Sequence, residues 1–302
     1  MLYFDNLQTA ADYFKALSSP TRIQIVQLLA LHENMSINEI ARQMELSDAT
    51  VSLHIKQLSD CGLVRIRSES GTHGTKKLCS LRDDKMMVDL SSRYATSNIK
   101  QISIGVGHYS NYNILPTCLL VGPNGVIGDF DDARYFAFPQ HHEAGMVCFG
   151  HGYLEYNLPN LLDEGETPKE LQLSFEIASE APGHNDNYPS DIHFQMNGID
   201  LGFWTSPGDY GEKKGLLNPP WYPDAFNQYG MLKILMINSA GTFVDGNTKL
   251  SDVTIKDLAL NYQSRIDFRI SSPEDAPNPG GVSLFGKGFG NYNQDIIFKM
   301  IV

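Results

Sequence analysis

Two segments in the N-terminal third of the sequence combine residue types that suit contact with nucleic acid. Residues 48–58, DATVSLHIKQL, carry small and hydrogen-bonding side chains, and residues 63–78, LVRIRSESGTHGTKKL, are rich in Lys and Arg. Small side chains let a helix approach base edges in the major groove, and basic side chains pair with phosphates. We therefore expect DNA contacts from Ala49, Thr50, Ser52, His54, Lys56, Gln57, Arg65, Arg67, His73, Lys76 and Lys77.

Helices are predicted to position the first of these segments. Apolar residues between 7 and 30 recur at helical spacing, which indicates two amphipathic helices. Ser36 followed by Glu39 is a capping box for a third helix, and Ser47 suits the N-cap of a fourth. The fourth helix has one apolar stripe that we expect to be buried, made of Val51, Ile55 and Leu58.

The basic segment is predicted to be a β-hairpin. Two short alternating runs within residues 63–81 flank the glycine-rich turn GTHGT. A helix-turn-helix followed by such a hairpin is a winged helix, in which the second helix of the motif lies in the major groove. For residues 1–96 we expect this fold, mainly helical with a hairpin wing, as a DNA-binding and dimerisation domain.

The stretches ALSSPTRIQIVQLLA and SINEIARQMELSDATVSLHIKQLSDCGLVRIR resemble the ArsR-type winged-helix repressors over about residues 8–90. The resemblance implies a transcriptional repressor that binds double-stranded operator DNA. It also implies a homodimer formed by the first and last helices of the module, near residues 5–17 and 83–94, on two operator half-sites. The cysteine and histidine ligands of the family's metal sensors are absent from IARQMEL and DDKMMVDLSSRY, so no metal site carries over.

Charge and composition divide the chain at about residue 96. Residues 1–96 hold 11 Lys+Arg and 11 Asp+Glu, which leaves 12 and 24 of the totals of 23 and 35 for residues 97–302 and places the whole net charge of −12 there. Of 26 glycines and 15 prolines, 3 and 1 precede residue 97. The acidic part is therefore not expected to bind nucleic acid, because that needs a surplus of cations.

Residues 97–302 read as an all-β domain. ELQLSFEIA (170–178) alternates between apolar and polar residues, and Asn197-Gly198 is a strong hairpin signal. About ten such runs with turn residues between them indicate an antiparallel, jelly-roll-like β-sandwich. The hairpin FQMNGIDLGFW also resembles the sugar-binding jelly rolls of the galactose-binding-like group.

The segment TSPGDYGEKKGLLNPPWYPDAFNQYG (205–230) is a long loop rich in aromatic, carboxylate and amide side chains. Sugars offer an apolar face and a rim of hydroxyls, which suits this combination. We predict a carbohydrate-like effector held by Trp204, Asp209, Tyr210, Trp221, Tyr222, Asp224 and Asn227. Alternatively, the tryptophans close the end of the sandwich, and the domain serves protein interaction or dimerisation.

A metal-responsive reading depends on one cluster, His141, His142, Cys148 and His151. It is weakened because Cys148 and His151 face opposite sides of an alternating strand. The aspartates of GDFDD (128–132) could hold calcium, but a solvated acidic turn explains them better. The four cysteines are far apart in sequence and form no zinc or disulfide pattern, so no metal or cofactor is expected.

No motif of an enzyme is found. The glycines of FGKGFG (285–290) lie between strands rather than before a helix, and no G-x-S-x-G sequence occurs. No apolar run approaches the roughly 18 residues of a membrane helix, and the first residues lack the features of a signal peptide. We expect a cytoplasmic, non-enzymatic protein without a membrane partner.

Overall fold

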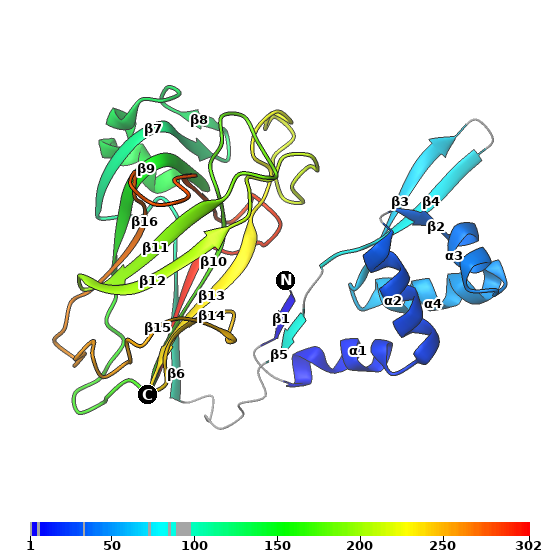
Figure 1. The fold of residues 1–302 in the computed structure, drawn as a ribbon, viewed down its shortest axis with the longest axis horizontal. Coiled ribbons are helices and arrows are strands. Elements are labelled where there is room, and N and C mark those ends of the chain that lie inside the picture. The colour runs from blue at the N-terminus through cyan, green and yellow to red at the C-terminus, as the bar shows by residue number, and fades with distance from the viewer. Residues whose placement is uncertain (1, 5–6, 33, 72–73, 84–85, 89–97) are drawn as a thin grey trace. The chain divides into compact units, whose positions relative to one another are not determined.

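The computed structural model describes residues 2–4, 7–32, 34–71, 74–83, 86–88 and 98–302. The chain divides into a first unit, Met1–Arg93, and a second unit, Tyr94–Val302 (Figure 1). The first is a helix-turn-helix with a hairpin, and the second consists of antiparallel strands. The expected fold class, a winged helix followed by an all-β antiparallel sandwich, is confirmed. No helix in the described residues is long and apolar enough to span a membrane.

Helices and a three-stranded sheet form most of the first unit. Their bounds are α1 (Leu7–Leu17), α2 (Pro20–Leu31), β2 (Met35–Ser36), α3 (Ile37–Gln43), α4 (Asp48–Asp60), β3 (Val64–Gly71) and β4 (Gly74–Leu81). The sheet has the order β2-β4-β3, and β3 and β4 are the wing hairpin. Strand β1 (Leu2–Phe4) pairs in parallel with β5 (Met86–Val88). Residues 86–88 therefore form a strand, whereas the resemblance implied a helix near residues 83–94.

The helix starts follow the predicted capping signals. Ser36 Oγ accepts the N–H of Glu39 at 3.4 Å, and the Ser36 N–H donates to Glu39 Oε2 at 2.7 Å, which confirms the capping box of α3. The Ser36 hydroxyl also donates to Glu39 Oε2, at 2.6 Å. This bond and the one from the Ser36 N–H, with a third from Lys76, lower the pKa of the Glu39 carboxyl to about 2. Ser47 caps α4 by accepting the N–H of Thr50 at 3.2 Å. Gly62 follows α4 at φ +87°, the left-handed region in which glycine is favoured.

Two strand layers enclose the main core of the second unit. One layer contains β12 (Ile199–Ser206), β11 (Ser190–Met196), β16 (Ile266–Ser272), β9 (Met146–Leu158), β7 (Asn111–Gly122) and β8 (Gly125–Ile127). The other contains β15 (Thr248–Ser251), β14 (Gly241–Val244), β13 (Met231–Asn238), β10 (Glu170–Ala178), β18 (Ile296–Ile301) and β6 (Ile99–Ile104). Strand β17 (Val282–Phe285) pairs with both β9 and β10 and so joins the layers.

The predicted strand patterns hold in the second unit. The apolar side of β10, which includes Leu171, Leu173 and Phe175, lies in the main core. Asn197 and Gly198 both have positive φ, 51° and 78°, in the tight turn between β11 and β12. Two short 3-10 helices, Ala133–Ala137 and Pro139–Glu143, lie between β8 and β9.

A long loop, residues 207–230, covers the other face of the strands around β17. Tyr222 of this loop packs with Cys148, Phe285 and Phe289 in a second apolar cluster, in which Tyr222 is 2% exposed. The carboxylate of Glu176 holds the end of the loop by accepting the N–H of Gly230 at 2.9 Å. It also accepts N–H groups of residues 291 and 292, and burial raises its pKa to about 8.

Candidate functional site

Helix α4 buries one side and exposes the other. Val51, Ile55 and Leu58 are at most 1% exposed, as their spacing predicts. On the opposite side Ala49, Ser52, Leu53 and Lys56 are exposed, and we call these four residues the α4 exposed face. Three of them were predicted to contact DNA. Thr50 is half-buried, and its hydroxyl lies 2.8 Å from that of the capping Ser47.

Leu53 is the residue that the sequence analysis missed on this face. Its side chain is 67% exposed, although leucine is usually buried. The spacing contained the signal, because position 53 falls outside the stripe of positions 51, 55 and 58 and between Ser52 and Lys56 on the outer side. Leucine is more often a core residue, but the position of Leu53 on the helix places it on the surface.

Two other residues predicted to contact DNA, His54 and Gln57, lie outside the α4 exposed face. His54 shares the buried side of α4, and its Nδ1 is buried without a hydrogen-bond partner among the described residues. Gln57 Oε1 accepts a hydrogen bond from the Arg22 guanidinium. Arg22 also donates to the main-chain carbonyl of Lys15 at 2.9 Å, so Gln57 connects α4 with α1 and α2.

The wing presents basic side chains on both of its faces. Residues opposite one another in an antiparallel pair share a face, so the register of Arg65 with Ser80 and of Arg67 with Leu78 places Arg65, Arg67 and Lys76 together. Lys77 lies on the other face with the buried Cys79. Arg67, Lys76 and Lys77 are exposed, and Arg65 is half-buried.

One wing lysine also contacts α3. Lys76 Nζ lies 3.3 Å from Oε1 of the capping residue Glu39, so this basic side chain is held at the start of the helix before the recognition turn. The predicted wing-tip residue His73 lies outside the described residues.

Three residues of the predicted effector site meet in a buried cluster beneath the 207–230 loop. Asn227 donates to Glu180 Oε2 at 3.1 Å, and Ser283 donates to the same oxygen at 2.7 Å. Tyr222 donates to Asn227 Oδ1 at 2.9 Å. Asp209 is fully buried and accepts the N–H of Ala181 at 3.0 Å, while its Oδ1 has no hydrogen-bond partner among the described residues. We call Glu180, Asp209, Tyr222, Asn227 and Ser283 the acidic cluster.

Burial governs the protonation of the acidic cluster. Removal from water raises the pKa of both Glu180 and Asp209, and the charge of Glu180 raises that of Asp209 further. Burial also raises the pKa of the Cys148 thiol, which lies beside Glu180. Both carboxyls therefore hold a proton more readily than an exposed carboxyl does, and Asp209, Tyr222 and Asn227 are buried beneath the loop.

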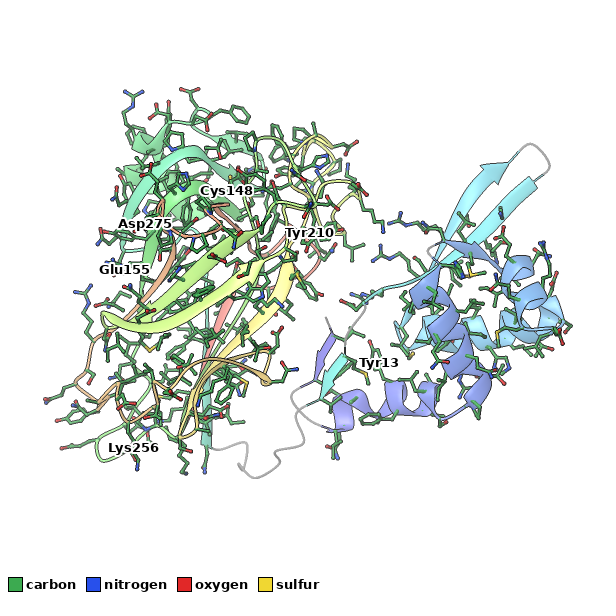
Figure 2. All side chains as sticks on the ribbon, in the orientation of Figure 1. Tyr13, Cys148, Glu155, Tyr210, Lys256 and Asp275 are labelled. Atoms are coloured by element: carbon green, nitrogen blue, oxygen red, sulfur yellow. The ribbon has the colours of Figure 1, made fainter. Side chains whose placement is uncertain are left out.

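The other predicted effector residues lie around this cluster or apart from it. Trp221 is 38% exposed and donates its indole N–H to the Pro123 carbonyl at 2.9 Å. Tyr210, labelled in Figure 2, stacks on Tyr229 with ring centres 5.3 Å apart. Asp224 is exposed and pairs with Lys214. Trp204 packs instead against the main core.

The environment of Trp204 differs from that of Trp221. Lys233 Nζ lies 4.6 Å from the centre of the Trp204 ring and 2.8 Å from Asp245 Oδ2. The side chains of Lys233 and Asp245 are 6% and 15% exposed and Trp204 is half-buried, so the ion pair and the cation–π contact help to stabilise the sandwich. The seven predicted residues therefore do not form one site.

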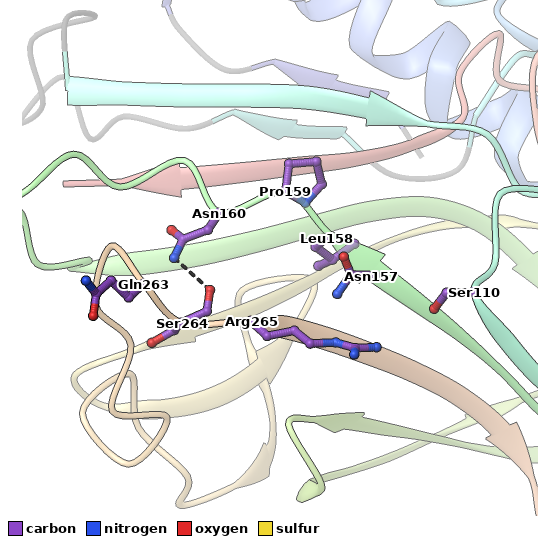
Figure 3. Close-up of a pocket in the computed structure, with 8 residues that line it drawn as sticks. All are labelled: Ser110, Asn157, Leu158, Pro159, Asn160, Gln263, Ser264 and Arg265. Atoms are coloured by element: carbon purple, nitrogen blue, oxygen red, sulfur yellow. Dashed lines mark hydrogen bonds between the residues drawn. The ribbon is translucent and has the colours of Figure 1, made fainter.

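An open cleft of about 510 Å³ lies elsewhere on the second unit (Figure 3). It is lined by Ser110, Asn157, Leu158, Pro159, Asn160, Gln263, Ser264 and Arg265. Carboxamide and hydroxyl groups dominate this lining, and the one guanidinium, of Arg265, is neutralised by Asp267 at 2.8 Å. Such a lining can exchange hydrogen bonds with an uncharged polar ligand. We call it the amide cleft.

The residues of the metal hypotheses have other partners. The His141 ring bonds the Gly107 carbonyl and stacks on Tyr109 at 4.4 Å, and Cys148 is buried beneath the loop. Asp131 accepts the N–H of Cys118 at 2.9 Å, and Asp132 pairs with Arg134. Within the described part of the chain, no group of three or more His, Cys, Asp or Glu is arranged to hold a metal ion.

A family model and several curated relatives match the first unit. Residues 19–65 match the family described as "Bacterial regulatory protein, arsR family". An HTH-type transcriptional regulator of Methanocaldococcus jannaschii is 32% identical over 82 residues, which are 27% of this chain and 88% of that protein. A Streptomyces lividans protein named "Probable mercury resistance operon repressor" is 34% identical over 82 residues, 27% of this chain and 61% of its own length.

A solved structure is also similar. The homodimeric winged helix-turn-helix domain of a Mycobacterium bovis protein is 32% identical, with a TM-score of 0.22, over 25% of this chain and 65% of its own. This chain therefore covers less than two thirds of the Mycobacterium bovis domain and less than two thirds of the Streptomyces lividans protein.

The acidic cluster leads to a prediction about pH. A carboxyl whose pKa is raised by folding stabilises the folded state fully below its unfolded pKa, and this contribution is lost as pH rises through the folded pKa. We expect Asp209→Asn to become more stable relative to wild type as pH rises from about 5 to about 9. Urea unfolding across this range measures the difference. Asp224→Asn, which changes an exposed carboxyl, should show no such trend, and equal pH slopes for the two variants would contradict the assignment.

Proposed function

Because the chain belongs to the ArsR family of bacterial regulatory proteins and is a transcriptional regulator of that family, we propose that it is a repressor that binds operator DNA as a homodimer. The observation that carries this proposal is the two-sided character of α4. On one side Val51, Ile55 and Leu58 are at most 1% exposed. The other side carries small side chains and Lys56, and the adjoining wing is basic. Repression is the action named for the related Streptomyces lividans protein.

The proposed interface has two kinds of contact. Ala49, Thr50 and Ser52 reach the base edges from the N-terminal half of α4, and Lys56 reaches them from further along the helix. The phosphates on either side are bound by Arg65, Arg67, His73, Lys76 and Lys77. Gln57 would support the interface indirectly, because its hydrogen bond from Arg22 holds the rotation of α4. His54 belongs to the proposed interface by its place on α4, half-buried beside the exposed face.

Helix α1 provides a surface for the homodimer. Leu7 and Phe14, 45% and 41% exposed, lie with the exposed Ala11 at spacings of four and three, which places them on one side of the helix. This apolar stripe has the form of a helix-helix seam, and a second copy of the chain would bury it against its own α1. Residues 83–94, also expected at the interface, are mostly outside the described residues.

We propose that the second unit senses a carbohydrate-like effector, at the exposed indole of Trp221 or in the amide cleft. A flat aromatic surface supports the first position and a lining of carboxamides and hydroxyls supports the second. The ligand would regulate by binding more tightly to one state of the dimer. A protein-interaction or dimerisation role is the alternative, favoured by the exposed rings of Phe130 and Phe138.

DNA binding is tested by a matched pair of charge reversals. Lys56→Glu should weaken binding to a duplex selected from random sequences by at least about tenfold and reduce its salt dependence, since a cation at the interface is lost. Lys256→Glu makes the same charge change on the second unit (Figure 2) and should leave affinity nearly unchanged. Fluorescence anisotropy titrations measure both, and equal losses would remove α4 from the groove.

The dimer is tested by adding charge to the apolar stripe of α1. Phe14→Glu should convert the dimer to a monomer, because a buried carboxylate without a partner is costly at the seam. Sedimentation velocity reports the mass. Leu31→Glu changes a side chain that is 79% exposed at the end of α2 and should remain dimeric. Dimers in both variants would place the interface elsewhere.

Effector binding is tested by melting the full chain with a panel of mono- and oligosaccharides. A ligand at 100 times its dissociation constant should stabilise the second unit by about 2.7 kcal/mol. Trp221→Ala should abolish the shift if the ligand lies on the indole, and Gln263→Ala should reduce it if the ligand lies in the amide cleft. A panel without any shift would favour the interaction role.

A further inference from the structure

Leu53 occupies an unusual position for an exposed leucine. It lies on the α4 exposed face, one residue from Ser52 and three from Lys56, and its side chain is 67% exposed. The small side chains of Ala49 and Ser52 leave Leu53 as the longest apolar group on this face. Nothing in the described part of the first unit covers it to the extent that Val51 and Ile55 are covered.

The surroundings of Leu53 favour DNA as the partner that covers it. Lys56 extends from the same face, and the exposed Arg67, Lys76 and Lys77 lie on the adjoining wing. A surface with an apolar side chain beside several cations is complementary to a major groove bounded by phosphates. The apolar side chain would then meet base edges, and the cations would meet the backbone.

Base edges differ in what they offer to an apolar side chain. In the major groove, guanine, adenine and cytosine present hydrogen-bond donors and acceptors, whereas thymine also presents its C5-methyl group. A leucine pressed against donors or acceptors leaves them without partners, which is unfavourable. Against a methyl group it removes apolar surface from water on both sides.

We propose that Leu53 contacts the C5-methyl of one thymine in each operator half-site and is a specificity-determining residue. This inference rests on the proposed DNA binding and adds the base that is read. The contact requires no movement of the helix core, because Leu53 already points away from Val51, Ile55 and Leu58.

Replacement of thymine by deoxyuridine tests the contact directly, since it removes the methyl group and leaves base pairing unchanged. A duplex is first selected from random sequences with the full-length wild-type chain, and each thymine is then replaced in turn. We expect one position per half-site at which the replacement lowers affinity by about fourfold, the effect of one buried methyl group. Replacement in both half-sites should multiply the losses.

Variants of Leu53 then assign the effect to this side chain. Leu53→Ala should bind thymine and deoxyuridine duplexes equally, and alanine is a strong helix former, so α4 is retained. Leu53→Met, which keeps an apolar side chain of similar volume, should preserve the difference. Leu31→Ala, a truncation of an exposed leucine on α2, should also preserve it.

The outcomes separate this inference from the function on which it rests. Selection of a specific duplex that shows no thymine-to-deoxyuridine effect, or an effect that persists in Leu53→Ala, would overturn the contact while leaving DNA binding intact. Failure of the wild-type chain to select any duplex would overturn the proposed DNA binding and the contact together.

Discussion

Burial of Val51, Ile55 and Leu58 along one side of α4 fixes the rotation of this helix, and the rest of the DNA-facing surface depends on that rotation. Each such side chain contributes about 1.5–3 kcal/mol when it is removed from water. If α4 rotated about its axis by the angle of one residue, part of the apolar stripe would be exposed to water and Lys56 would be buried. The hydrogen bond from Arg22 to Gln57 and the Ser47 cap hold the same rotation from the two ends of the helix. A hydrophobic constraint thus decides which polar groups reach outward.

The second unit shows a different constraint, the placement of buried carboxylates. The carboxylate of Glu176 on β10 is buried, and that of Glu180, two residues after the end of β10, is half-buried; both accept hydrogen bonds from the 207–230 loop. Three main-chain N–H groups satisfy Glu176, whereas Glu180 is satisfied by side chains of Asn227 and Ser283. The loop is therefore fastened to the sheet by polar groups as well as by Tyr222. For this reason several residues whose types suited a sugar are used to close the fold.

Local signals in the sequence predicted most of the elements. The capping box at Ser36, the stripe of α4 and the Asn197-Gly198 turn each depend on a few neighbouring residues, and each is present. Contacts between distant segments were not predictable in the same way. Gln57 pairs with Arg22, 35 residues earlier, and the lining of the amide cleft comes from residues near 110, 160 and 264. A residue's type indicates which chemistry it can perform, whereas its partners depend on how the whole chain packs.

The division of charge between the units limits how an effector can act on DNA binding. Residues 97–302 carry the entire net charge of −12. The second unit therefore cannot increase the affinity of the protein for DNA by approaching the phosphates. At physiological ionic strength such repulsion fades beyond about 8 Å. Regulation by the proposed effector would then come from a difference in ligand affinity between the free and the DNA-bound forms of the proposed dimer. That difference is reciprocal: a ligand that lowers operator affinity tenfold is itself bound tenfold more weakly when the operator is present.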